Sequence, residues 1–152
     1  MHQEEIKLRS QGFPLIAGVD EAGRGPLAGP VVAAAVILPS DYRNPRIRDS
    51  KTLTALERER LFAEIKSVAV SYATAAVSQK KIDEMNILNA SKLAMRQAVL
   101  KLSPRPDFVL IDAVALNLPG VAQKALIHGD ATVFSIAAAS ILAKVTRDRL
   151  MQ

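Results

Sequence analysis

The sequence contains no cysteine and no tryptophan, and aromatic residues make up only 4% of its 152 residues. The absence of cysteine excludes disulfide-stabilised scaffolds, thiolate zinc sites and cysteine nucleophiles. Only two histidines are present, so few nitrogen ligands are available for a metal ion. With 49% hydrophobic and 23% charged residues, the chain nevertheless has the composition of a folded globular protein rather than a disordered or fibrous one.

Long apolar runs are also absent. The longest, residues 31–38, is too short to span a bilayer, and residues 1–11 lack the apolar stretch of a secretory signal. We therefore expect a soluble, cytoplasmic protein that does not bind membranes. The length suits one domain over residues 1–152, which begins with a polar lead-in at residues 1–14.

The pattern of apolar residues predicts an α/β fold. Five short segments rich in apolar residues are typical of strands, and three amphipathic or alanine-rich segments are typical of helices. The expected strands are residues 15–20, 31–38, 68–77, 108–112 and 124–128, and the expected helices are residues 55–67, 87–102 and 135–150. The first of these helices carries a capping box, in which Thr54 is followed by Glu57.

Acidic residues stand at the ends of two of these strands. The segments LIAGVD and FVLID end on Asp20 and Asp112, and Asp130 follows the last expected strand. If the first two strands are parallel neighbours, Asp20 and Asp112 converge at their carboxyl ends, where α/β sheets usually bind ligands.

Glu21 comes directly after Asp20. If the strand continued past Asp20, the side chain of Glu21 would point to the opposite face of the sheet from that of Asp20. We expect the strand to break at Asp20. Gly23 and Gly25 would then bend the backbone so that both carboxylates face one cleft.

Four crowded carboxylates repel one another and call for a divalent cation. Oxygen ligands favour Mg²⁺ or Mn²⁺ over zinc. The net charge is +5, and without these four acids 20 Lys and Arg residues stand against 11 acids, so the rest of the chain carries +9. An acidic pocket in a basic chain suits an enzyme that holds two metal ions against a phosphate backbone and hydrolyses a phosphodiester.

Other interpretations of the same residues remain open. Asp130 could equally well be the cap of the helix expected at residues 135–150. The stretch 23–30 could be an ordinary turn, and the basic segment 43–51 a solvated loop. A nucleotide-binding domain is a weaker alternative, because no Lys-Ser or Lys-Thr pair follows the glycines.

Five blocks of sequence, in this order, resemble the bacterial ribonuclease HII family. They are GVDEAGRGPLAG at 18–29, DSK at 49–51, ILNASKLAM at 87–95, LIDA at 110–113 and HGDATVFSIAAASILAKVTRD at 128–148. The resemblance implies an RNase H-like fold, with a central mixed β-sheet flanked by helices. It also implies a metal-dependent endoribonuclease that cuts the RNA strand of RNA–DNA hybrids and ribonucleotides embedded in duplex DNA, leaving a 3′-hydroxyl and a 5′-phosphate.

The resemblance also assigns roles to individual residues. Four of them match the family's catalytic metal ligands: Asp20, Glu21, Asp112 and Asp130. Six match its substrate-binding residues: Gly23, Arg24 and Gly25, which read the ribose 2′-hydroxyl, and Lys51, Lys144 and Arg147, which lie near the phosphates. Asp148 is a candidate outer-sphere or extra metal ligand. Because Lys144 and Asp148 are four positions apart, an ion pair on the helix surface is the alternative role for Asp148.

Family members typically continue beyond the AKVTRD block to a GYG-type stretch whose tyrosine stacks on the sugar at the RNA–DNA junction. This chain ends at Gln152, so we expect it to lack that tyrosine. The expected protein is a monomer that acts on nucleic acid with bound Mg²⁺ or Mn²⁺. The alternative is a hybrid-binding domain with little or no turnover.

Overall fold

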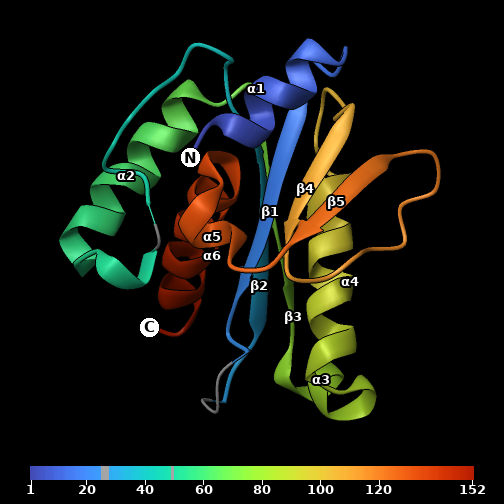
Figure 1. Ribbon diagram of the computed structural model, residues 1–152. Helices are drawn as coiled ribbons and strands as arrows, with labels where there is room; N and C mark the ends of the chain where they lie inside the picture. Colours follow the sequence, from blue (N-terminus) through green and yellow to red (C-terminus); the bar gives the residue numbers. More distant parts are fainter. Residues whose placement is uncertain (25–27, 49) are drawn as a thin grey trace.

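Five strands form one mixed sheet in the computed structural model (Figure 1), which describes residues 1–24, 28–48 and 50–152. In chain order the strands are β1 (Ile16–Ala22), β2 (Val31–Ile37), β3 (Ser71–Val77), β4 (Phe108–Asp112) and β5 (Ala122–Leu126). Their order across the sheet is β3-β2-β1-β4-β5. The pairs β1/β4 and β4/β5 are parallel, whereas β1/β2 and β2/β3 are antiparallel, so the parallel pairing expected for the strands that end at Asp20 and Asp112 is confirmed.

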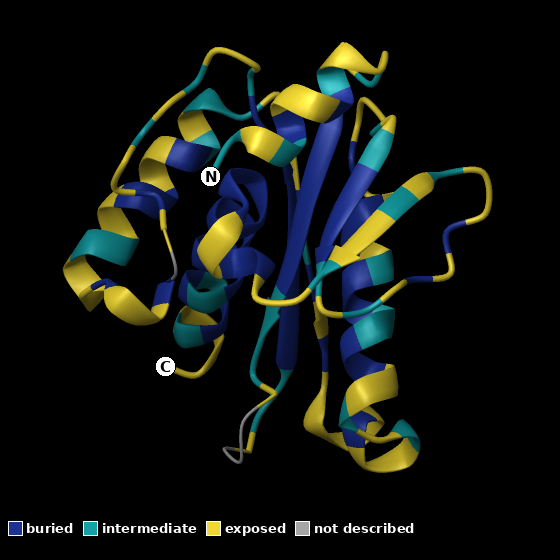
Figure 2. Ribbon diagram, in the orientation of Figure 1, coloured by how far each residue is buried: buried dark blue, intermediate teal, exposed yellow. Residues whose placement is uncertain are grey.

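Helices cover both faces of this sheet, as Figure 1 shows. In the described part of the chain, the helices and the 3-10 turn are α1 (Gln3–Ser10), η1 (Ser50–Thr52), α2 (Ala55–Val68), α3 (Gln79–Met85), α4 (Ile87–Leu100), α5 (Gly129–Thr132) and α6 (Phe134–Leu150). Apolar residues of α2 and α6 pack with β2 on one face, and those of α4 pack with β1, β2 and β4 on the other. The central strands are consequently buried, and the exposed residues lie on the outer sides of the helices, in the connecting loops and at the sheet edges (Figure 2). The predicted arrangement of a mixed sheet flanked by helices is confirmed.

The alternation of side chains along β1 sends its odd and even residues to different layers. Ala17 and Val19 join the cluster under α4, whereas Ile16 packs with residues on the α6 side. Gly18 lies on the α6 side as well, and a Cβ there would stand 2.2 Å from the carbonyl carbon of Ser135. Only glycine therefore allows α6 to lie directly on β1.

Strand β1 is longer than the sequence predicts. It continues through Glu21 and Ala22, which pair with Ala33 and Val32 of β2, so the expected break at Asp20 does not occur. Pairing with a neighbouring strand decides this boundary, and the local sequence does not encode it.

Residues 3–10, expected only as part of a polar lead-in, form α1. Its sequence has little amphipathic pattern, since only Glu5 and Leu8 are buried. Tertiary contacts hold the helix in place: Leu8 packs against Val133 and its neighbours, and the Phe134 N–H donates to the Met1 carbonyl at 2.9 Å.

Glu5 is a buried acid at the contact between α1 and α6. It is 3% exposed, and its Oε1 has no hydrogen-bond partner among the described residues. Burial raises the pKa of Glu5 to about 7, although Arg9, the N-terminal amine and Arg43 oppose the rise. In the folded protein the carboxyl group of Glu5 therefore keeps its proton until the pH approaches neutrality.

We expect Gly18→Ala to destabilise the fold by about 3 kcal/mol, because its methyl group would overlap the backbone of α6. Chemical denaturation measures the loss. Gly12→Ala is the matched control, because its φ is 97° but nothing lies within 4 Å of the added Cβ. It should cost only the backbone strain, about 1 kcal/mol. Equal losses in the two variants would contradict the close packing of α6 on β1.

Glu5 should make stability depend on pH. Its folded pKa of about 7 exceeds the ordinary value of 4.5, so its contribution is complete below pH 4.5 and is lost as the pH rises through 7. Relative to Glu5→Gln, the free energy of unfolding of the wild type should fall by up to about 3 kcal/mol over this range. Urea denaturation of both proteins at several pH values measures the difference, and a difference that stays constant with pH would contradict it.

Candidate metal centre

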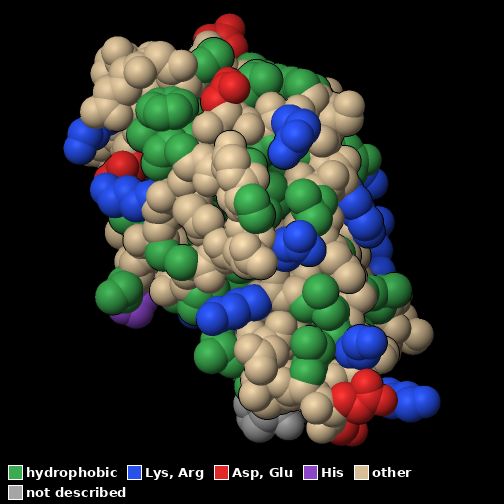
Figure 3. Space-filling view, turned by 90° about the vertical axis from the view of Figure 1, so that its right-hand side faces the viewer, with side chains coloured by type: hydrophobic (Ala, Val, Ile, Leu, Met, Phe, Trp, Pro, Cys, Tyr) green, Lys and Arg blue, Asp and Glu red, His purple; other side chains and the backbone are tan. Residues whose placement is uncertain are grey.

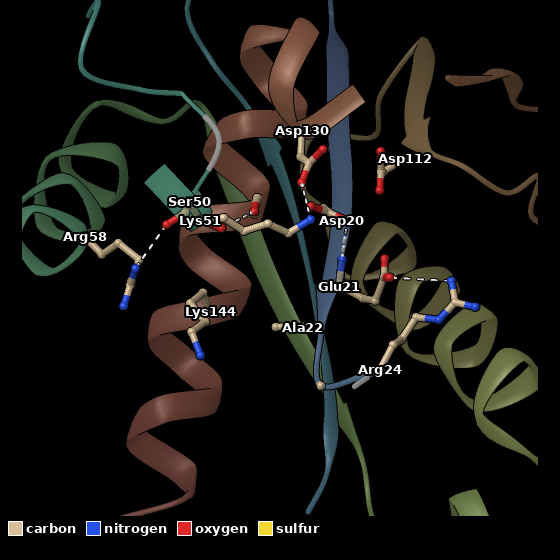
Figure 4. A pocket seen from close by; sticks show the side chains of 12 residues that line it. Asp20, Glu21, Ala22, Arg24, Ser50, Lys51, Arg58, Asp112, Asp130 and Lys144 are labelled. Carbon is tan, nitrogen blue, oxygen red and sulfur yellow. Dashed lines mark hydrogen bonds and ion pairs between the residues drawn. The ribbon is translucent and has the colours of Figure 1, made fainter. Parts of the chain in front are cut away.

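Three carboxylates that are distant in sequence meet at one edge of the sheet. Asp20 lies in β1, Asp112 ends β4 and Asp130 lies in α5, and each offers an oxygen within 4.8 Å of the other two. The register explains the first pair: Val19 is aligned with Ile111, so the next residues of the two parallel strands are the two aspartates. Figure 4 shows the three side chains directed into the same pocket.

Backbone donors fix the direction of two of these acids. The N–H of Gly129 donates to Oδ1 of Asp112 at 2.8 Å, and the N–H of Glu21 donates to Oδ1 of Asp20 at 2.8 Å. A Cβ at Gly129 would lie 2.6 Å from Cδ1 of Ile136, so the end of that side chain would have to move to admit one. The turn after β5 is therefore attached directly to the end of β4.

Asp130 does not cap α6. It lies in the first turn of α5, and α6 begins after Val133, whose side chain makes no capping hydrogen bond. The capping role considered for Asp130 is thus excluded, and its buried carboxylate belongs to the pocket.

Glu21 reaches the pocket from the other face of β1. Its Oε1 lies 3.6 Å from Nη1 of Arg24, whereas its buried Oε2 has no hydrogen-bond partner among the described residues. Glu21 lines the same pocket as the aspartates but is not one of the close trio. No break in the strand is needed to bring it there, because it stands at the rim where the strand ends.

The electrostatics of the pocket favour a bound cation. Burial, together with the negative charges of Glu21 and Asp112, raises the pKa of Asp20 well above its ordinary value. Burial also raises the pKa of Glu21. A donor set made of carboxylate oxygens, with one buried oxygen still lacking a partner, fits a hard divalent cation such as Mg²⁺ or Mn²⁺.

Cationic side chains form the walls of this pocket, which has a volume of about 410 Å³. Three of them are predicted substrate-binding residues: Arg24, Lys51 of η1 and Lys144 of α6. Nζ of Lys51 stands 3.9 Å from Oδ2 of Asp130. Nζ of Lys144 pairs with Oδ1 of Asp148 at 3.0 Å, so the ion pair considered for Asp148 is present.

Arg147 lies behind the segment that carries Gly23 and is not among the residues that line the pocket. It is 5% exposed, and its Nε donates to the carbonyl of Pro30 at 2.9 Å and its Nη2 to that of Ala28 at 3.3 Å. Gly23, with φ of 101°, lies so close that a Cβ would be 2.4 Å from Nε of Arg147. Gly25, predicted to bind substrate, lies outside the described residues.

Four pocket residues were not identified as site residues from the sequence: Ala22, Ser50, Arg58 and Ser140. The two serines lie within sequence blocks that resemble the family, but nothing in the sequence indicated their contact, because it joins segments 90 residues apart. The position of Arg58 did carry a signal. It stands one turn into α2, and side chains near the start of a helix point back toward the residues that precede the helix.

The basic residues do not gather into a single patch elsewhere on the face beside β5 and α4. Figure 3 shows Lys and Arg side chains scattered over it among apolar and other groups.

Comparisons with known proteins agree with this geometry. The family model for ribonuclease HII matches residues 17–152. Ribonuclease HII from Syntrophomonas wolfei is 58% identical over 148 residues, covering 97% of this chain and 58% of that protein. The enzyme of the same name from Listeria monocytogenes serotype 4b is 56% identical over 152 residues, covering 100% of this chain and 58% of that protein. The chain thus spans less than two thirds of the length of these relatives.

Among solved structures, ribonuclease H2 from Pyrococcus horikoshii superimposes with a TM-score of 0.79 at 31% identity. The match covers 90% of this chain and 74% of that one. In the described part of this chain, no helix has both the length and the apolar character that crossing a membrane requires.

We expect Mn²⁺ to bind at this pocket and to raise Tm. Asp112→Asn should weaken binding about tenfold or more, because it removes one charge from the trio. Asp148→Asn, an acid near the pocket but outside the trio, is the matched control and should bind as the wild type does. Isothermal titration calorimetry measures both, and equal affinities for the two variants would contradict the assignment of the trio.

Proposed function

Because this chain belongs to the ribonuclease HII family, we propose that it is a metal-dependent endoribonuclease that hydrolyses the RNA strand of RNA–DNA hybrids. The observation that carries this proposal is the trio of carboxylates within 4.8 Å of one another, set in a pocket with cationic walls. We include residues 1–152 in one catalytic domain. It acts as a monomer, since the acids and the cations around them come from one chain.

The metal ligands in this proposal are Asp20, Asp112 and Asp130, with Glu21 as a fourth through its unpartnered Oε2. Two Mg²⁺ or Mn²⁺ ions bound there would supply an activated water and stabilise the leaving oxygen, which yields a 3′-hydroxyl and a 5′-phosphate. The protein orients these acids in advance, because backbone N–H groups donate hydrogen bonds to Asp20 and Asp112 in the absence of any ligand.

Substrate binding is assigned to the walls of the pocket. Lys51 and Lys144 offer ammonium groups to the phosphates beside the scissile bond. Gly23 and Arg24 lie at the end of β1, next to the acids, in a position to approach the ribose 2′-hydroxyl of a ribonucleotide in a hybrid or embedded in duplex DNA.

Arg147 supports this arrangement from behind. Its hydrogen bonds to the carbonyls of Ala28 and Pro30 hold the backbone at residues 28–30, beside Gly23, so its contribution to substrate binding acts through the backbone.

The test is cleavage of an end-labelled RNA–DNA hybrid in Mn²⁺ or Mg²⁺. Asp20→Asn and Asp112→Asn should each lose about 100-fold or more of the activity, since even groups that only orient metal ligands are worth 10–100-fold. Asp148→Asn should retain activity, and chelation by EDTA should abolish it. Equal cleavage by wild type and both site variants would contradict the proposal.

Binding of the hybrid should weaken steeply as salt increases, because phosphate contacts release counterions. Binding without cleavage would instead support the second candidate, a hybrid-binding domain with little turnover. This candidate is kept because the chain spans only 58% of the length of its curated relatives.

A further inference from the structure

We propose that Arg58 is a positioning residue of this site: it clamps the turn that carries Lys51 and so aims that lysine at the acidic trio. The proposal rests on the function proposed above and adds a residue to it. Arg58 lies on α2, outside the sequence blocks that identify the family, and it lines the pocket beside Ser50 and Lys51.

The turn that carries Lys51 is too short to hold its own orientation. It is η1, a 3-10 helix of only three residues, Ser50–Thr52, and the Lys51 side chain is 81% exposed. Short 3-10 segments have poorer hydrogen-bond geometry than α-helices. Contacts from neighbouring elements must therefore hold the turn if Lys51 is to stay near Asp130.

Arg58 makes such contacts on both sides of Lys51. Its Nη1 donates to the carbonyl of Ser50 at 3.0 Å and to that of Leu53 at 2.7 Å. Figure 4 shows the guanidinium reaching from α2 to the Ser50 end of the turn. One charged donor thus bridges the residue before Lys51 and the second residue after it.

A second attachment joins the same turn to α6. Oγ of Ser50 lies 2.8 Å from Oγ of Ser140, and both serines are buried. The turn is therefore held between two helices, by Arg58 of α2 and by Ser140 of α6. The start of α2 is itself fixed by the capping box of Thr54 and Glu57, so Arg58 acts from a rigid base.

This geometry distinguishes Arg58 from its neighbour Arg60. Arg60 is exposed and lines a separate small pocket with Glu57 and Glu64. Arg60→Gln removes the same charge from the same helix and leaves the clamp intact, which makes it the matched control for Arg58→Gln.

The first measurement does not depend on activity. Hydrogen exchange of the full chain should show faster exchange for residues 50–54 in Arg58→Gln, by about tenfold, because the turn opens more often once its clamp is lost. Exchange in β1 and α6 should stay unchanged, and Arg60→Gln should match the wild type. Unchanged protection of residues 50–54 in Arg58→Gln would overturn the proposal.

The second measurement is a double-mutant cycle on hybrid cleavage, with Lys51→Gln as the partner change. Arg58→Gln alone should lower kcat/KM about tenfold, but in the Lys51→Gln background it should lower it by no more than about twofold, because it acts through that lysine. Equal losses in both backgrounds would overturn the proposal and give Arg58 a separate role. If the wild type cleaves no hybrid, the proposed nuclease function fails, and hydrogen exchange still decides whether the clamp exists.

Discussion

Repulsion among three close carboxylates, two of them buried, is the constraint on which the rest of this structure depends. Asp20, Asp112 and Asp130 approach within 4.8 Å, and burial strengthens the repulsion by removing the water that would screen it. The protein holds them together by parallel pairing of β1 with β4 and by the bond from Gly129 to Asp112. The apolar clusters on both faces of the sheet offset this cost, and Asp20 and Asp112 stand toward the carboxyl ends of β1 and β4, whose central residues are buried (Figure 2).

Much of this arrangement could be predicted from the sequence, because it follows from short-range pattern. The apolar runs before Asp20 and Asp112 predicted both strands. Parallel pairing of these strands then predicted that the two acids meet at their carboxyl ends. The end of β1 could not be predicted, because it depends on pairing with Ala33 and Val32 of β2. Helix α1 was not expected for a similar reason, since contacts with Phe134 and its neighbours stabilise it more than its own pattern does.

The cations of the site differ in what they do, and the sequence alone did not separate them. Lys51 is largely exposed above the acids, whereas Arg147 is buried and donates to backbone carbonyls. Both belong to blocks shared with the family, so the resemblance placed them in one class. Burial and hydrogen-bond partners divide them into groups that can meet a ligand and groups that shape the backbone around it.

The contact of Gly18 with α6 has a consequence for how this pocket can change during evolution. Ser140, Lys144 and Arg147 all lie on α6, so they move as one body with a helix seated on the backbone of β1. No one of them can be shifted relative to the acids without disturbing the others. The wall carrying Lys51 is held instead by the side chains of Arg58, Ser50 and Ser140, so substitutions there can change the entrance of the pocket while Asp20, Asp112 and Asp130 stay in place.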